Sequence, residues 1–168
     1  MKKRFFLLLG IGVLAVFVSC GSAPAAAQSG FTFAEGSMEE ARDFMRQNDY
    51  YIATVDGDRP QARPFGTAAI FEGKLYIITS KAKDVSKQMA ANPNICIVAH
   101  ERNSVNGMRI TAIAVNDNQP EAKQAVLAAH PGMEAIYPPG GENTQVLSLK
   151  DATATVYAYT TTQITFQF

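Results

Sequence analysis

The sequence contains no tryptophan and only two cysteines and two histidines in 168 residues. So few thiol and imidazole groups leave little for a metal site or a disulfide framework. Cys96 and His100 fall on one face of a predicted strand, but the extended chain separates them by about 13 Å, which is too far for one metal ion. The sequence also lacks a nucleophile-elbow pattern, so neither a metal centre nor a Ser-His-Asp device is expected.

An excess of positive charge is also missing, because 15 Lys and Arg residues balance 15 Asp and Glu residues. Lys2, Lys3 and Arg4 lie in a segment that we expect to be removed, which leaves 12 basic residues against 15 acidic ones. A protein that contacts many phosphates needs a basic surface. We therefore expect no nucleic-acid partner.

No apolar run reaches the ~20 residues of a comfortable membrane-spanning helix. The apolar stretch Phe5–Val18 follows a positively charged start, which is typical of a signal peptide. The stretch Phe17-Val18-Ser19-Cys20 resembles a bacterial lipoprotein processing site, so we expect a signal peptide over residues 1–19 and a lipid on Cys20. Secretory cleavage within Ala23–Ala27 is the alternative. In the first case the protein is anchored in the bacterial cell envelope, facing the periplasm or in the outer membrane.

Residues 20–36 are rich in Ala, Ser and Gly and predict a flexible tether. The folded domain is expected over residues 37–168, a length that permits one sizeable core. Its first signal is the capping box Ser37-Met38-Glu39-Glu40, in which a hydroxyl and a carboxylate cap the start of a helix. The apolar stripe of that helix comprises Met38, Ala41, Phe44 and Met45.

Three apolar runs rich in β-branched and aromatic residues follow, at Tyr51–Val55, Ala62–Phe71 and Leu75–Thr79. Tight turns at Asp56-Gly57-Asp58 and Glu72-Gly73 separate them, which predicts a three-stranded meander. A helix over Asp84–Ala91, stopped by Asn92-Pro93, and a second helix opening at Pro120 come next. Further strands are expected over Ile95–Glu101, Met108–Val115, Thr144–Leu149, Thr153–Tyr159 and Ile164–Phe168.

The corner Thr79-Ser80-Lys81-Ala82-Lys83 is the best candidate for chemistry. It offers hydroxyl donors and positive charge at the start of a helix, where unpaired N–H groups suit an anion. Arg63, on the preceding strand, can reach the same edge and bind a phosphate with its two-pronged guanidinium. The other interpretation is a surface strand end with solvated lysines.

Arg63-Pro64-Phe65-Gly66 also has two interpretations. Pro64 marks an edge or bulged position, because proline cannot donate to a sheet. Alternatively, such an edge leaves the backbone near Gly66 free to approach a flat ring. Gln88 faces either a ligand or solvent, Arg109 either a cofactor cleft or a surface ion pair, and the loop Tyr137–Gly141 flanks the cleft without an assigned role.

The ordered set YYIATV, GDRPQARPFG, GKLYIITS, KAKDVSKQMAANPN and ICIVAH resembles the pyridoxamine 5′-phosphate oxidase-like flavoproteins, over residues 37–159. The resemblance implies a mainly β fold, an antiparallel FMN-binding split barrel with about three peripheral helices and six or seven strands. It also implies a homodimer with two FMN sites. Thr79, Ser80, Lys81 and Lys83 would hold the FMN phosphate, and the Arg63–Gly66 strand would lie against the isoalloxazine ring.

Asp84 and Val85 stand where pyridoxamine 5′-phosphate oxidases carry an Arg-Lys pair, so Lys81 or Lys83 would supply the charge here. The resemblance therefore favours FMN binding over vitamin B6 oxidation. We expect an FMN-dependent oxidoreductase of unknown substrate. The alternatives are a non-catalytic lipoprotein that carries FMN, heme or another planar ligand, and an envelope protein with an empty cleft.

Overall fold

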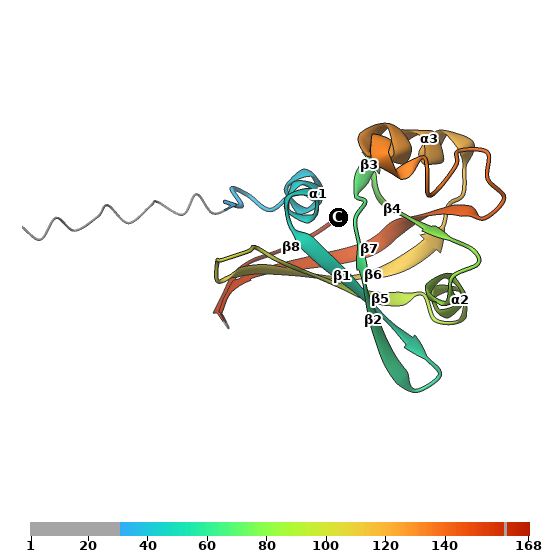
Figure 1. Cartoon of the computed structure of the whole chain (residues 1–168). Coiled ribbons are helices and arrows are strands. Elements are labelled where there is room, and N and C mark those ends of the chain that lie inside the picture. Colours follow the sequence, from blue (N-terminus) through green and yellow to red (C-terminus); the bar gives the residue numbers. More distant parts are fainter. Residues whose placement is uncertain (1–30, 160) are drawn as a thin grey trace, which may run out of the picture.

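A computed structural model describes residues 31–159 and 161–168. The predicted signal peptide, Cys20 and the tether up to residue 30 lie outside the described residues. The described part contains eight strands, rather than six or seven, and three α-helices (Figure 1). The strands are β1 (Asp49–Asp56), β2 (Arg59–Phe65), β3 (Ala69–Phe71), β4 (Lys74–Ser80), β5 (Asn94–His100), β6 (Asn106–Asn116), β7 (Thr144–Ala158) and β8 (Thr161–Gln167). The helices are α1 (Met38–Gln47), α2 (Asp84–Ala91) and α3 (Pro120–Ala129), and a 3-10 turn (Pro131–Met133) follows α3.

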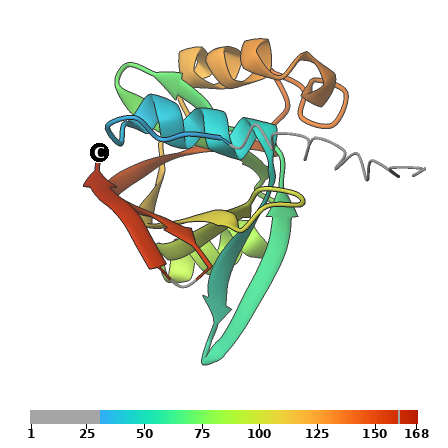
Figure 2. The same ribbon diagram turned by 90° about the vertical axis from the view of Figure 1, so that its left-hand side faces the viewer.

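The strands pair antiparallel in the order β2-β1-β5-β6-β7-β4-β3, and β8 pairs with the second half of β7. The sheet curls around a core, as Figure 2 shows, but β2 and β3 at the two ends of this order are not paired with each other. Ile52, Ile97 and Ile110 of neighbouring strands are fully buried inside it. This architecture confirms the predicted split barrel with three helices.

The predicted capping box starts α1. The Ser37 hydroxyl accepts from the Glu40 N–H at 3.1 Å, and the Glu40 carboxylate accepts from the Ser37 N–H at 3.2 Å. Ala41, Phe44 and Met45 are buried and Met38 packs at the edge of the same cluster, as the stripe predicted. α1 contacts β1 and β3 and runs beside one opening of the barrel (Figure 2).

The six described residues before Ser37, Phe31–Gly36, pack against the barrel, although the sequence predicted a tether over residues 20–36. The rings of Phe31 and Phe33 lie 5.2 and 5.3 Å from the ring of Phe44. Gly36 has φ +79°, and a Cβ there would lie 2.6 Å from the ring of Phe166. Because the aromatic rings bury apolar surface and Gly36 permits the close turn, this segment is part of the domain.

The predicted three-stranded meander is wrong in its connections. The run Ala62–Phe71 is not one strand: it forms β2, then crosses at Gly66–Ala68, and then forms β3 at the opposite end of the strand order. Two hairpins, β1–β2 and β3–β4, replace the meander. Pro64 does lie on an edge strand, as its missing N–H predicted.

Tyr50 holds the crossing segment in place. Its hydroxyl donates to the Thr67 carbonyl and accepts from the Thr67 N–H at 3.2 Å, and the Thr67 hydroxyl accepts from the Ile78 N–H at 3.0 Å. Tyr50 and Thr67 are 1% and 2% exposed. These bonds satisfy backbone groups that the crossing would otherwise bury without partners.

Helix α2 has the predicted bounds, and Pro120 opens α3 as predicted. The two strands predicted at Thr144–Leu149 and Thr153–Tyr159 are instead one strand, β7. Asp151, with φ +52°, produces an irregularity within it rather than a turn. In the described part of the chain, no helix is long and apolar enough to span a bilayer.

Candidate functional site

The edge strand β2, the Thr79–Lys83 corner and the loop after α3 enclose one cavity of about 280 Å³. Its polar lining comprises Arg63, Thr67, Thr79 and Lys83, and the rest of the wall is mostly apolar. The other lining residues are Pro64, Phe65, Gly66, Ile78, Val85, Met133, Ile136 and Tyr137. A few polar groups in an apolar wall are typical of a site for a small organic ligand.

Arg63 is fixed between β1 and α2. Its Nη1 donates to Thr54 Oγ1 at 2.5 Å and its Nη2 donates to Gln88 Oε1 at 2.7 Å. The Thr54 hydroxyl also donates to Gln88 Oε1, at 2.6 Å. Burial lowers the pKa of Arg63, but a guanidinium stays protonated at any relevant pH. The group has five N–H donors, so a positive charge with donors to spare is held at the cavity.

The Thr79–Lys83 corner is a tight turn that leads into α2. Ser80 Oγ accepts from the Ala82 N–H at 3.2 Å, and the Ser80 carbonyl accepts from the Lys83 N–H at 3.0 Å. The Lys81 N–H donates to the Asn143 carbonyl at 2.8 Å, which ties the corner to the loop before β7. No side chain caps the start of α2, so its first N–H groups and its partial positive charge remain suited to an anion.

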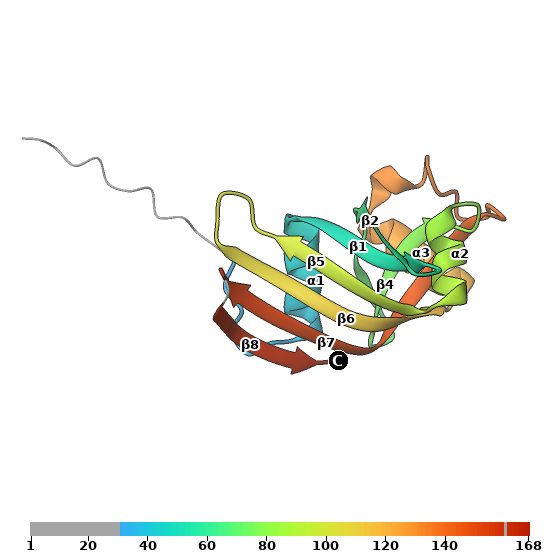
Figure 3. The ribbon, with the colours of Figure 1, turned by 90° about the horizontal axis from the view of Figure 1, so that it is seen from below.

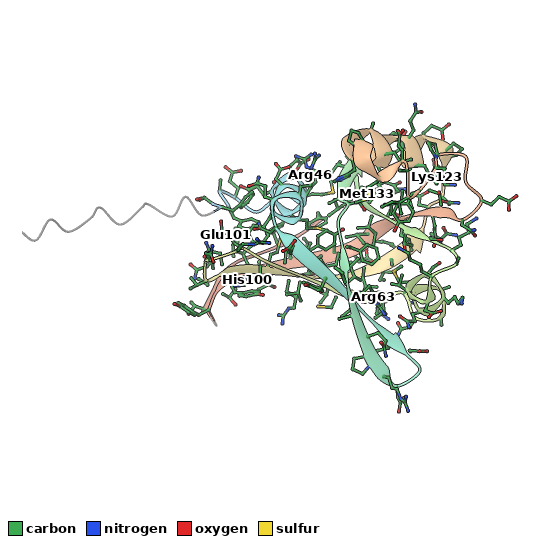
Figure 4. The ribbon with its side chains drawn as sticks, in the orientation of Figure 1. Arg46, Arg63, His100, Glu101, Lys123 and Met133 are labelled. Atoms are coloured by element: carbon green, nitrogen blue, oxygen red, sulfur yellow. The ribbon has the colours of Figure 1, made fainter. Side chains whose placement is uncertain are left out.

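Lys83 links the corner to the loop after α3. Its Nζ donates to the Tyr137 hydroxyl at 2.7 Å, while the Lys83 side chain remains exposed. Met133 and Ile136 of the same loop line the cavity, and Ile136 is 63% exposed. The loop thus forms the outer wall of the cavity, with Lys83 at one end. Met133 of this loop and Arg63 of β2 are labelled in Figure 4.

The structure brings most of the predicted site residues together. Arg63, Pro64, Phe65, Gly66, Thr79 and Lys83 line the cavity, Gln88 contacts Arg63, and Ser80 and Lys81 form the adjoining turn. Arg109 lies apart from them, exposed on the outer face of β6 and in register with Val98 and Thr155.

Thr54 and the loop residues Met133, Ile136 and Tyr137 were not predicted as site residues. The proline- and glycine-rich composition of Tyr137–Gly141 did indicate a loop at the cleft. Nothing local in the sequence indicates that Thr54 contacts Arg63, because the contact depends on α2 packing over β1.

A larger cavity, of about 610 Å³, lies where β4 and β8 diverge along β7. Its charges are already paired. Asp117 accepts from Lys74 Nζ at 2.9 Å and from the Tyr76 hydroxyl at 2.7 Å. The hydrogen bond from Lys74, with that from Tyr76, lowers the pKa of Asp117 to about 2. Because this site has no comparable set of converging donors, the smaller cavity is the better candidate.

Known proteins share this fold. The family model described as pyridoxamine 5′-phosphate oxidase matches residues 37–158. The structure of a NimC/NimA family protein from Clostridium acetobutylicum is 31% identical and has a TM-score of 0.73, covering 78% of this chain and 92% of that chain. No protein with a curated description matches the sequence.

Two more distant structures share the fold. General Stress Protein 26 from Bacillus anthracis is 12% identical, with a TM-score of 0.61 over 76% of this chain and 98% of that chain. A heme binding protein from Mycobacterium smegmatis is 16% identical, with a TM-score of 0.57 over 80% of this chain and 60% of that chain.

The fold and the candidate site define a class of protein: split barrels that have a cationic, partly apolar cavity. The chain belongs to the pyridoxamine 5′-phosphate oxidase family. Members of this family often bind FMN and are commonly dimers.

The residues present fit FMN. Lys83 and the uncapped start of α2 suit its phosphate, the buried Thr79 offers a hydroxyl, and Arg63 adds a second positive charge. The apolar wall suits a flat ring. The volume of 280 Å³ is slightly below the ~300–1,000 Å³ of sites that enclose a drug-sized ligand. A single chain would therefore enclose only part of an FMN molecule.

Proposed function

We propose that the protein is an FMN-dependent oxidoreductase that binds the cofactor in the cavity between β2, α2 and the loop after α3. The observation that carries the proposal is that Arg63 of β2 and Thr79 and Lys83 of the corner before α2 line one cavity with mostly apolar walls. Bound FMN would supply the hydride or electron transfer itself.

The chain's own residues bind and orient the cofactor. Lys83 and the start of α2 neutralise the phosphate, and the Thr79 hydroxyl donates to it. Arg63, held by Thr54 and Gln88, keeps a fixed cation beside the cofactor. Pro64 and Phe65 exclude water from one side of the ring.

A homodimer completes the site in this proposal, because the single-chain cavity of about 280 Å³ is below the usual ~300–1,000 Å³ of sites that enclose such a ligand. The outer face of β1, β5 and β6 offers an apolar surface for a second copy. Tyr51 and Val98 are directly opposite each other there and are 50% and 38% exposed. Arg109, next to Val98 in the sheet, lies on the same face and would reach the partner's site.

We also propose that a lipid on Cys20 anchors the protein in the bacterial envelope. The basis is the signal-peptide pattern of residues 1–19 followed by cysteine. A water-soluble cofactor site and an N-terminal lipid are physically compatible, because the sequence predicts a flexible connection between Cys20 and the domain.

The absorbance spectrum of the purified protein tests the proposal. We expect yellow protein that releases FMN on denaturation and bleaches with dithionite, and turnover with an added electron donor would establish the enzyme. A Soret band instead of a flavin spectrum would favour a heme carrier, a function for which the fold of the M. smegmatis heme binding protein is the support. Colourless protein that ignores added FMN would reject both.

A further inference from the structure

We propose that the end of the barrel from which the N-terminal chain leaves rests on the membrane surface, with the Lys83 end of the cavity turned away from the lipid. The inference rests on the proposed function and on the expected lipid at Cys20. It adds a defined lipid-facing surface and an orientation to both.

The N-terminal segment fixes where the chain leaves the domain. The Phe31 N–H donates to Glu101 Oε1 at 2.8 Å, and Glu101 follows β5 directly. The Phe31 ring packs against the rings of Phe33 and Phe44. Residues 31–36 are packed against the barrel, and ten residues of the sequence separate them from Cys20. Ten residues of any chain span at most about 35 Å, and the Ala-, Ser- and Gly-rich composition of the predicted tether gives an expected average span of about 18 Å.

Strand β5 separates this end from the Lys83 end of the cavity. It begins at Asn94, just after α2, and ends at His100, next to Glu101. Seven residues of strand span about 23 Å. Figure 3 shows the loop between β5 and β6 and helix α2 at opposite ends of the barrel, and Figure 4 shows Glu101 and His100 apart from Arg63. A tether with an average reach shorter than β5 keeps the Glu101 end nearest the lipid.

Tyr159 gives this end a lipid-facing side chain. It is 78% exposed, and its N–H donates to the Val105 carbonyl at 3.0 Å in the loop that also contains Glu101. Its φ of +54° favours Gly or Asn, so neither packing nor local backbone preference explains a tyrosine there. Tyrosine is enriched at membrane–water interfaces, where its ring meets the headgroups and its hydroxyl meets water.

Arg102 lies in the same loop and is also directed outward. The Arg102 side chain is 81% exposed. It forms an ion pair at 3.1 Å with Asp49, whose side chain is 77% exposed. An exposed pair of this kind contributes little to stability, so a phosphate headgroup can replace Asp49 at low cost. An aromatic ring and a cation therefore face outward where the tether begins.

The opposite orientation has electrostatics in its favour, since Lys81, Lys83 and Lys87 make the α2 end basic. That attraction requires anionic lipid and decays within a Debye length of about 8 Å, whereas the tether acts on any bilayer. With the Lys83 end facing water, the electron donor or substrate must reach the cavity from the aqueous side. The class of partner is thus water-soluble, rather than a carrier dissolved in the bilayer.

A single introduced tryptophan tests the orientation, because the chain contains none. The lipidated mature protein is inserted into phosphatidylcholine vesicles with brominated acyl chains, with unbrominated vesicles as the reference. We compare Tyr159→Trp with the control Ala90→Trp, which is exposed on α2 at the other end. We expect brominated lipid to quench Tyr159→Trp several-fold more strongly than Ala90→Trp, with and without added phosphatidylserine.

Equal quenching of the two variants, stronger quenching of Ala90→Trp, or failure of the protein to float with the vesicles would each overturn the proposal. FMN binding is measured separately on the same variants. Quenching at Tyr159→Trp in a protein that binds no FMN would support the orientation while rejecting the proposed cofactor. A protein that binds FMN but shows equal quenching of the two variants would support the proposed cofactor and reject the orientation.

Discussion

Replacing Tyr50 by phenylalanine should lower the free energy of unfolding of the domain and also reduce the affinity of its cavity for FMN. The substitution removes only the hydroxyl, which bonds both backbone groups of Thr67 in the segment between β2 and β3. Gly66 and Thr67 of that segment line the cavity. The perturbation therefore acts on the fold and on the site through the same two bonds.

The magnitude follows from burial. Tyr50 and Thr67 are almost completely buried, so water cannot replace the lost partner in the folded state. A buried group left without a partner costs about 1–3 kcal/mol. Two such groups, one of them in a longer bond of 3.2 Å, give an expected loss of about 2–4 kcal/mol in the free energy of unfolding.

Chemical denaturation of wild type and Tyr50→Phe measures this loss, with a fall in Tm of about 10 °C as the thermal counterpart. Tyr159→Phe is the matched control, since Tyr159 is 78% exposed and its substitution should change stability by less than about 0.5 kcal/mol. FMN affinity should fall in Tyr50→Phe and not in the control. A stability equal to wild type would refute the assignment of Tyr50 as the residue that holds the crossing segment.

Three further predictions concern single residues. Asp117, with its pKa lowered to about 2 from 3.8, stabilises the fold fully above about pH 4 and loses that contribution as the pH falls toward 2; Asp117→Asn should flatten the acid limb of a stability–pH curve, and an unchanged limb would contradict the ion pair. Gly36→Ala should destabilise the N-terminal segment, because its Cβ would overlap Phe166, and limited proteolysis should then cleave near Phe31; unchanged protection would contradict the packed segment. Cys20→Ala should move the protein from the membrane to the soluble fraction, and continued membrane association would show that the anchor is elsewhere.

Local signals in the sequence predicted the helices well. Ser37 and Glu40 form the expected capping box, and Asn92-Pro93 ends α2 where the chemistry of proline requires. These signals depend on residues within a few positions of one another. The positions of the helices therefore followed from the sequence.

The connections between strands were harder to predict. An apolar run such as Ala62–Phe71 is compatible with one strand, and nothing within it shows that the chain crosses the barrel at Gly66–Ala68. That crossing depends on Tyr50, which lies 17 residues from Thr67 in the sequence. Similarly, Lys150 and Asp151 are polar like a turn, but the left-handed backbone of Asp151 is accommodated within a continuous β7.

Several residues that line the candidate cavity were named from the sequence. Clustering of hydroxyls and lysines before α2 identified Thr79 and Lys83, but the partners that position them are distant in sequence. Arg63 depends on Gln88, 25 residues away, and Lys83 contacts Tyr137, 54 residues away. Such contacts depend on the tertiary fold and have no local signature.

Titration of the purified apoprotein with FMN tests the central claim most directly. We expect saturable binding to wild type, one FMN per chain. The double variant Thr79→Ala with Lys83→Ala should lose a few kcal/mol of binding free energy, because hydrogen bonds to a charged phosphate contribute about 1.5–3 kcal/mol each. Lys87→Ala, a neighbouring lysine on α2 outside the cavity lining, should bind as wild type does. Equal affinity of the double variant and wild type, or no binding to wild type, would contradict the assignment of this cavity to FMN.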